Sequence, residues 1–265
     1  TDVTGTSVPF PAPSQSNAIG VMVSTNDNTI GGMVPAARNV IAGFTTGVGL
    51  SFGLRNKVQG NYIGTDFTGT QALGNRDAGV GITAFDSTIG GTGSGAGNII
   101  GFSHIGIRIG SISGQSGNGS PDGNAIRRNS IFGNTFGGIS FDFFIARPPA
   151  PVLTASAGTL SGAKPNTSYT IEFFANPACD VFEQGKTFIS DVTVLTDGNG
   201  NTAAPFNVPS GQNITATASA AGSNTSVFSN CTAGSTSSAQ ISLSPTQLSF
   251  SANVGDTNPQ TPQNV

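Results

Sequence analysis

The residues Gly79-Val80-Gly81-Ile82 are one copy of a four-residue pattern that decides the fold of this chain. The pattern is a glycine, a branched aliphatic residue, any residue, and then an apolar residue. The other copies are Gly20-Val21-Met22-Val23, Gly47-Val48-Gly49-Leu50, Gly106-Ile107-Arg108-Ile109 and Gly138-Ile139-Ser140-Phe141. Their glycines are 27, 32, 27 and 32 residues apart. A period of this size indicates a stacked architecture, because one unit cannot bury its own apolar side without neighbours.

A longer repeat supports the same interpretation. Residues 20–47 align without a gap on residues 79–106, with 11 of 28 positions identical. Each unit contains apolar runs of a few residues that alternate with period two and are separated by Gly, Asn, Asp and Thr. Such runs are too short and too rich in glycine for helices. The sequence therefore predicts an all-β fold, with a right-handed parallel β-helix over residues 1–147 whose inward aliphatic residues stack about 4.8 Å apart.

Asparagines and two variable stretches mark the expected corners and loops of this solenoid. Asparagine opens several apolar runs, at Asn39, Asn56, Asn98 and Asn124. Asparagine tolerates the left-handed backbone conformation, so we expect these residues at coil corners, paired with asparagines above or below. Stretches 65–77 and 110–123 differ in length between units, and we expect them to be loops that project from the scaffold.

Composition excludes several classes of partner. Only 9 % of the residues are charged and the net charge is −3, so nothing attracts nucleic acid or an anionic membrane electrostatically. The longest apolar runs fall far short of the roughly 20 residues that a membrane span requires. We therefore expect no nucleic-acid partner and no transmembrane segment. No signal peptide opens the chain, and Thr1 is either a trimmed mature end or an arbitrary boundary.

The pattern changes after three prolines in the stretch 147–151. Residues 148–232 show longer alternating strands and a hairpin turn at 197–201, which is typical of an immunoglobulin-like β-sandwich. Residues 233–265 contain a Ser/Thr/Gly/Ala linker and then the first strand of a truncated further β-domain. We therefore expect this sequence to be part of a longer chain.

The two cysteines, Cys179 and Cys231, allow two interpretations. They are either reduced, buried thiols or a disulfide. The extracellular character of the composition and the neighbouring turn residues favour the disulfide. Closing a loop of about fifty residues would stabilise the fold by roughly 4 kcal/mol in the chain-entropy model.

Several of these segments carry a family likeness. Four of them are NTIGG from Asn28, RNVIAG from Arg38, NKVQGNYIGTDFTGTQALGN from Asn56 and GVGI from Gly79. They resemble the right-handed parallel β-helix repeats of large secreted bacterial surface proteins. The stretch from YTIEFFANPACD to Cys231 resembles the small β-sandwich that often follows such helices, and in that resemblance the two cysteines match a paired set. The likeness covers about residues 17–250. It implies fold and an extracellular or cell-surface location, but no catalytic residues.

Many parallel β-helices are polysaccharide lyases or glycosidases, whose sites lie on an outward strand face. Because the aliphatic residues of the pattern point inward, the intervening residues form outward columns, in which Arg108 and Asp142 carry the charges. A glycosidase needs two carboxyl groups about 5–9.5 Å apart, and a calcium site needs six or more oxygens. This face offers neither, so we expect no metal and no cofactor.

Other polar residues allow a catalytic and a structural interpretation. Asp27 and Asp86 occupy equivalent positions two coils apart, which is a distance of roughly 10 Å. This is close to the separation of the two carboxyl groups in an inverting glycosidase. The favoured interpretation is that each aspartate caps its own turn. Asp66 is likewise favoured as a turn residue and His104 as a structural side chain. The run 197–201 resembles a calcium loop without its final glutamate, which favours a plain hairpin turn.

Two functions follow as hypotheses. The first is a non-enzymatic segment of a secreted or cell-surface bacterial protein, an elongated scaffold for adhesion or glycan and matrix contact through loops 65–77 and 110–123. The alternative is an extracellular carbohydrate-active enzyme, either polysaccharide lyase or glycosidase, or a glycan-binding module, with a polar groove beside Arg108, Asp142 and Asp86. The expected partner is a polysaccharide or a surface protein.

Overall fold

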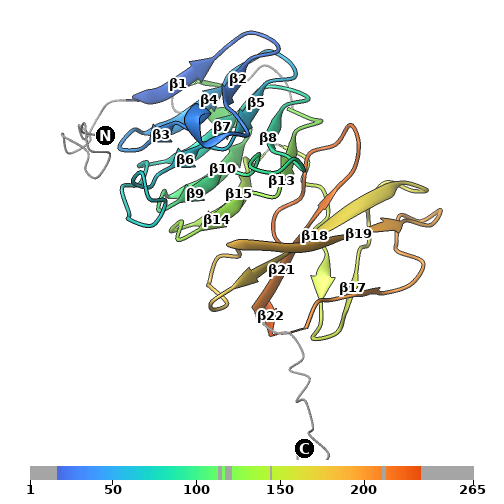
Figure 1. Ribbon diagram of the computed structural model, residues 1–265. Helices are drawn as coiled ribbons and strands as arrows, with labels where there is room; N and C mark the ends of the chain where they lie inside the picture. The colour runs from blue at the N-terminus through green and yellow to red at the C-terminus, as the bar shows by residue number, and fades with distance from the viewer. Residues whose placement is uncertain (1–16, 113–114, 117–120, 144, 211–212, 234–265) are drawn as a thin grey trace, which may run out of the picture.

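A parallel β-solenoid of about four turns forms the N-terminal part of the molecule (Figure 1). The computed structural model describes residues 17–112, 115–116, 121–143, 145–210 and 213–233. Their regular structure consists of strands, apart from one short 3-10 helix at Pro35–Ala37. Among these residues no helix is long and apolar enough to cross a membrane. The segment 240–265, expected to begin a further β-domain, lies outside the described residues.

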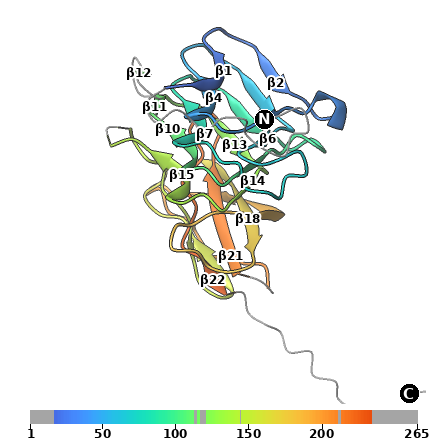
Figure 2. The ribbon, with the colours of Figure 1, turned by 90° about the vertical axis from the view of Figure 1, so that its left-hand side faces the viewer.

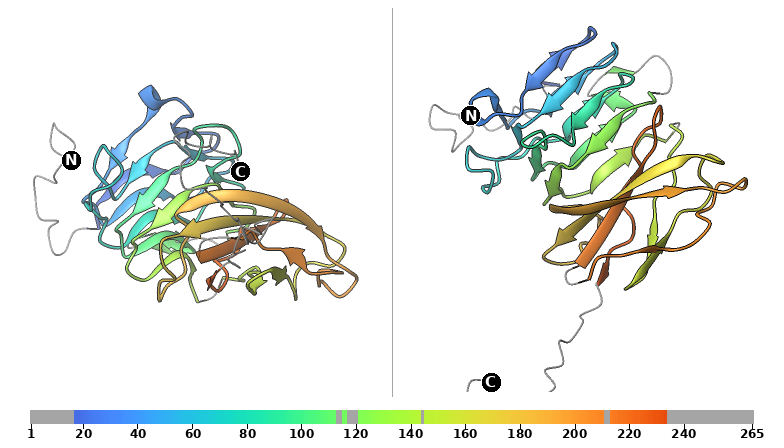
Figure 3. Two further views of the ribbon diagram at one scale, coloured as in Figure 1. Left: turned by 60° about the horizontal axis from the view of Figure 1, so that its bottom comes forward. Right: turned by 45° about the vertical axis from the view of Figure 1, so that its right-hand side comes forward.

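Three parallel sheets form the walls of the solenoid, and each complete coil contributes one strand to each wall (Figure 3). The first wall contains β1 (Ile19–Val23), β4 (Thr46–Leu50), β7 (Ala78–Ile82), β10 (Ile105–Ile109) and β15 (Gly137–Phe141). The second contains β2 (Thr29–Gly31), β5 (Lys57–Gln59), β8 (Thr88–Gly90) and β13 (Ala125–Arg127). The third contains β3 (Val40–Ile41), β6 (Tyr62–Ile63), β9 (Ile99–Gly101) and β14 (Ser130–Phe132).

The five copies of the glycine pattern lie directly above one another, as predicted. The register of the first wall pairs Val21, Val48, Val80, Ile107 and Ile139 in that order. Val48, Val80 and Ile107 have no exposed surface. Full burial of one such side chain stabilises a fold by about 1.5–3 kcal/mol, so this column is a principal source of solenoid stability.

The glycine of the pattern is required by the close approach of the next coil. A Cβ atom on Gly47 would lie 2.7 Å from the carbonyl oxygen of Gly79 and 2.9 Å from a methyl group of Ile63. Real Cβ contacts are almost never shorter than 3.0 Å, so alanine would force the coils apart. Gly79 meets the carbonyl of Gly106 at the same distance. The repeated glycine therefore sets the spacing of the coils.

Asparagines form ladders along the solenoid axis, which confirms their predicted pairing. The ladder before the third wall contains Asn39, Asn61, Asn98 and Asn129. At each step the backbone N–H and the side-chain Nδ2 donate to the Oδ1 of the next asparagine, for example from Asn61 to Asn98 at 2.9 and 3.1 Å. A second ladder, before the second wall, pairs Asn28 with Asn56.

The expected left-handed conformation of these asparagines is wrong. None of Asn39, Asn56, Asn98 and Asn124 has a positive φ. In the second ladder the corner is instead turned by the residue just before each ladder position, at Asp27, Arg55 and Asp86, with φ of 60°, 57° and 50°. The asparagine side chain is engaged with the next coil, and the tight turn is made one residue earlier.

One expected loop also differs from the prediction. The stretch 110–123 contains a hairpin of β11 (Ser111–Ile112) and β12 (Gln115–Ser116), and β11 lies against β7 and β4 instead of projecting away. Gly49 and Gly81, on the outward side of the first wall, are both buried. Glycines in this column leave room for chain to cross the outer face of the wall.

Two ladders are each interrupted by one serine, the ladder before the second wall and the ladder before the first wall. Ser87 follows Asn56 in the second ladder, and Ser103 follows Asn75 in a third ladder, before the first wall. The Nδ2 groups of Asn56 and Asn75 are buried without a hydrogen-bond partner. An unsatisfied buried amide is destabilising, so these two steps are weak points of the stack.

Ser87→Asn is expected to complete the second ladder and to raise stability by about 1 kcal/mol. The new Oδ1 would accept from Asn56, and its Nδ2 would donate to Asn124, whose Oδ1 already accepts from the backbone of Ser87. Chemical denaturation of both proteins measures the change. Ser24→Asn, at an exposed position, is the matched control and should leave stability unchanged. A destabilised Ser87→Asn protein would show that serine is needed there for space.

The C-terminal part, which lies below the solenoid in Figure 2, consists of two antiparallel sheets. The larger contains β19 (Thr187–Leu195), β18 (Ser168–Asn176), β21 (Asn213–Ser219) and β22 (Thr232–Ala233). The smaller contains β16 (Val152–Leu153), β17 (Ala157–Thr159) and β20 (Phe206–Asn207). Ile171 and Phe173 of the larger sheet share an apolar cluster with Leu153 and Phe206 of the smaller. Cys179 and Cys231 form a disulfide, which confirms the favoured interpretation over reduced thiols.

The C-terminal part covers the end of the solenoid. Phe174 of β18 and Phe228 of the irregular stretch 224–231 belong to the apolar cluster of the solenoid and not to that of the C-terminal sheets. Asn224 accepts from the backbone and Nδ2 of Asn124 at 3.1 and 3.0 Å, so it is the last step of the second ladder. Sequence reasoning did not find this contact, because the two asparagines are 100 residues apart.

A buried ion pair joins the two parts. The side chain of Glu172 has no exposed surface. It accepts from Nε of Arg127 at 2.7 Å and from the backbone N–H of Arg128 at 3.0 Å. A buried charge is stable only with such partners, so this contact fixes how β18 lies against the last coil.

Glu172→Ala is expected to lower the free energy of unfolding by about 3–5 kcal/mol, because it leaves the Arg127 guanidinium without its carboxylate. Asp191→Ala provides the control, since Asp191 contacts Arg128 at a half-exposed position and should cost less than about 1 kcal/mol. Urea denaturation of the three proteins gives both values. Equal effects of the two substitutions would contradict a specific role for the buried pair.

Candidate functional site

Arg108 and Asp142 lie together on the outer face of the first wall, but a third residue dominates their contact. Both Nη atoms of Arg108 bind the carboxylate of Asp77, at 2.6 and 2.9 Å. Asp142 Oδ1 lies farther from Arg108, 4.0 Å from its Nε. Sequence reasoning missed Asp77. The available signal was its position 31 residues before Arg108, close to one coil period.

This cluster is built for charge pairing across coils. A guanidinium that binds a carboxylate with two nitrogens occupies the oxygens that a general base or nucleophile would use. The Arg108 and Asp77 side chains are each about one-fifth exposed, and Asp142 somewhat more. The arrangement can hold β7, β10 and the end of β15 in register, and it presents a partly exposed carboxylate at Asp142.

Asp86 is not part of this cluster. It lies at the corner before β8, in a column with Asp27 and Arg55, where the backbone N–H of Asp86 donates to the carbonyl of Asp122. Among the described residues no ion pair joins Asp86 to Arg108. The structure thus brings Arg108 and Asp142 together and places Asp86 at a different corner, and a groove that combines all three stays a prediction.

Asp27 and Asp86 are two coils apart, as the repeat predicts, but Arg55 occupies the same column in the coil between them. Its guanidinium donates to both oxygens of Asp27, at 2.8 and 2.7 Å. These hydrogen bonds hold the pKa of Asp27 below its usual value. A carboxyl group that stays ionised cannot act as the general acid of an inverting pair.

Asp66 caps the loop 65–77. It is buried and accepts hydrogen bonds from the hydroxyl of Thr68 and the backbone N–H groups of Thr70 and Gln71. Desolvation raises the pKa of this carboxyl, but the hydrogen bonds together outweigh it, so the pKa lies below its usual value. Both oxygens of the carboxylate accept from groups of this loop, so the carboxylate organises it.

Asp66→Asn is expected to destabilise the protein at pH 7 and to have little effect in strong acid. Because the folded pKa is lowered, the carboxylate contributes stability above its unfolded pKa of about 3.9, and this is lost as the pH falls through the folded value. Thermal denaturation of both proteins from pH 7 to pH 2.5 measures the difference. A constant difference over this range would mean that ionisation is irrelevant.

His104 borders a shallow hollow of about 410 Å³ at the corner before the first wall. The hollow is lined by apolar Phe44, Leu73 and Phe102 and by polar residues that include Arg76 and Thr135. The Nδ1 of His104 lies 3.1 Å from the hydroxyl of Thr135. Residues 73–76 of the loop 65–77 form one side, so one predicted contact loop lies beside a real depression.

An exposed aromatic stack continues from His104. The ring of His104 lies 5.0 Å from that of Phe136, which lies 5.1 Å from that of Phe182. Phe136 is 51 % exposed although it is a large apolar side chain. The three residues come from two neighbouring coils and the C-terminal part, so the stack exists only in the assembled fold.

The remaining candidates are structural in their contacts. Asp197 accepts from the backbone N–H groups of Asn199 and Asn201 at 2.8 and 2.9 Å, which lowers its pKa and caps the hairpin turn. In the described part of the chain no group of three or more metal-ligating side chains gathers. A second hollow, of about 460 Å³, lies between β19 and β20, and its one carboxylate, Asp191, is paired with Arg128.

Comparison with known proteins adds no assignment to this geometry. A scan against models of protein families finds no match, and no curated protein matches the sequence significantly. The function therefore has to be argued from the contacts themselves.

Proposed function

We propose that this chain is a non-enzymatic segment of a secreted or cell-surface bacterial protein, an elongated scaffold for adhesion or glycan and matrix contact. In this proposal the solenoid is a right-handed parallel β-helix and the two C-terminal sheets form an immunoglobulin-like sandwich. The supporting observation is the use of charge on the outer face. Arg55 and Arg108 each bind a carboxylate of the preceding coil, an arrangement that stabilises a stack and provides no acid–base pair.

The disulfide supports the proposed location. Disulfides persist in oxidising surroundings such as the cell surface and are rare in the cytosol. The bond between Cys179 and Cys231 is compatible with an extracellular protein, and the large share of uncharged polar residues in the chain agrees with it.

The hollow beside His104 is the proposed contact region. Its lining combines aromatic rings with donors and acceptors from Arg76 and Thr135. Saccharides present apolar C–H faces and hydroxyl groups on the same ring, so they match a surface that offers both kinds of contact. Phe136 and Phe182 extend the aromatic surface beyond the hollow.

A polysaccharide panel tests this function, with binding and turnover measured on the same samples. Binding without turnover is expected, and Phe136→Ala should weaken it about tenfold, equivalent to about 1.4 kcal/mol. Leu195→Ala removes another exposed large apolar side chain, at a site away from the hollow, and serves as the matched control. Turnover that Asp142→Ala or Asp86→Ala abolishes would instead establish the carbohydrate-active enzyme. Binding that Phe136→Ala leaves intact would place the contact outside the aromatic stack that adjoins the hollow.

A further inference from the structure

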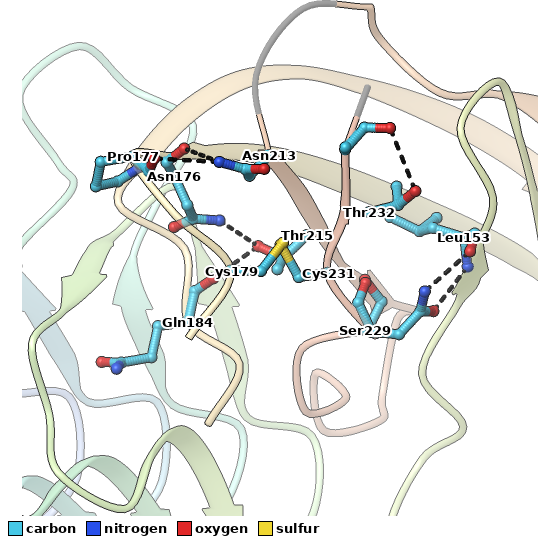
Figure 4. The surroundings of a disulfide bond; sticks show 12 residues. Leu153, Asn176, Pro177, Cys179, Gln184, Asn213, Thr215, Ser229, Cys231 and Thr232 are labelled. Atoms are coloured by element: carbon cyan, nitrogen blue, oxygen red, sulfur yellow. Dashed lines mark hydrogen bonds between the residues drawn. A yellow bond between two sulfur atoms is a disulfide. The ribbon is translucent and has the colours of Figure 1, made fainter. Parts of the chain in front are cut away.

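The disulfide joins two stretches of the C-terminal part that each also contact the last coil of the solenoid. Cys179 and Cys231 are 52 residues apart in sequence, with Cα atoms 5.6 Å apart. Cys179 is exposed and Cys231 is half-buried, so a thiol reagent in solution can reach the bond. Figure 4 shows the bond beside β21, with Gln184 on the segment that follows Cys179.

The first segment, residues 179–186, is called the strap. Gln184 accepts from the backbone N–H and Nδ2 of Asn134, at 2.9 and 3.0 Å, and its own Nε2 donates to the Asn134 carbonyl at 3.0 Å. Gly185 exchanges two backbone hydrogen bonds with Ile131, at 2.8 and 3.0 Å. The carbonyl of Glu183 accepts from Gly138. The strap therefore continues the third ladder and pairs with the free edge of β14.

The second segment, residues 224–230, is called the return segment. Beyond the ladder contact of Asn224, the backbone of Thr225 donates to the carbonyl of Asn124, and its hydroxyl accepts from the backbone of Ile126 at 2.9 Å. The ring of Phe228 packs against Gly138, where a Cβ atom would lie 2.7 Å from it. This segment covers the ends of the second and first walls.

The disulfide joins the first residue of the strap to Cys231, the residue that directly follows the return segment. Cys179 precedes Gln184 by five residues and Cys231 follows Phe228 by three. Two hydrogen bonds also hold the strap to its own sheet, from the Thr215 hydroxyl to the Gln184 carbonyl and from the Lys186 backbone to Asn176. The disulfide is the covalent element of this end closure.

We propose that the Cys179–Cys231 disulfide is a redox-sensitive latch on the cap of the solenoid. A dithiol reductant supplies the two electrons: one of its thiolates attacks a cysteine sulfur to form a mixed disulfide, and its second thiolate releases that cysteine. The products are two protein thiols and the cyclic disulfide of the reductant. An exposed disulfide is the kind that such exchange reaches. This inference goes beyond the proposed function and is independent of any ligand.

Opening of the latch has a defined structural consequence. Without the cross-link only hydrogen bonds to β21 hold the strap and the return segment in place, for example from Thr215 to Gln184 and from Ser229 to Ala216, so the open state of the cap becomes more populated. Opening uncovers Ile131 and Ile139 and the free edges of β13, β14 and β15, which are the features that make a sheet end prone to association. The cap is thus expected to close fully only in an oxidising compartment.

The latch is tested by measuring amide hydrogen exchange of this chain under native conditions, before and after reduction with dithiothreitol. The amides of Ile131, Asn134 and Gly138, which donate to the strap, are expected to exchange at least tenfold faster after reduction. The amides of Tyr62 and Ile99, which bond between earlier coils, should keep their rates. Reoxidation should restore protection of the last coil.

Two variants separate the latch from a general loss of stability. A Cys179→Ala, Cys231→Ala protein should show the fast exchange of the last coil without reductant and no response to dithiothreitol. Gln184→Ala, with the disulfide intact, should loosen the strap partially and still respond. Unchanged exchange in the last coil on reduction would overturn the proposal, as would equal acceleration in all coils. Saccharide binding is read separately, so its failure leaves this result unaffected.

Discussion

The structure depends on hydrogen bonds between neighbouring coils, because a coil of three short strands has no partner for its backbone or its apolar side chains within itself. The asparagine ladders show this dependence most clearly. Each amide satisfies groups of the next coil, as from Asn61 to Asn98, and the glycine of the repeated pattern lets the coils approach closely enough for it. A stack of this kind is stable only if its ends are also satisfied.

The C-terminal part meets that requirement at one end. Gln184 and Asn224 supply the next step of two ladders, and Phe174 and Phe228 complete the apolar column. The last coil of the solenoid is therefore completed by side chains of the C-terminal part, while the C-terminal sheets enclose a separate apolar cluster of their own. The prolines near residue 148 predict a domain boundary between the two parts. Charges serve the same stacking role: Arg55 and Arg108 bind carboxylates 28 and 31 residues earlier.

The predictable part of the fold is the part that repeats. Five copies of one pattern determine the stacking of Val21 with Val48, and repetition makes that inference secure without any long-range information. The capping contacts could not be predicted, because Asn124 and Asn224 are related by no repeat. The site illustrates the same limit: the outward column revealed Arg108, but its main partner Asp77 lies at a strand start outside that column. The left-handed conformation expected for the corner asparagines is wrong because a residue that tolerates a conformation does not have to adopt it.

A regular stack presents the same chemistry at every coil, so recognition of a particular ligand requires a place where the repeat is broken. The corner before the first wall is such a place. One residue, His104, separates Ser103 from β10, whereas Thr135 and Phe136 fill the equivalent position one coil later. The loop 65–77 is inserted on the adjacent coil, and the hollow forms between these irregularities. The uniform coils provide rigidity, and the departures from uniformity at this corner provide a surface that differs from the rest of the stack.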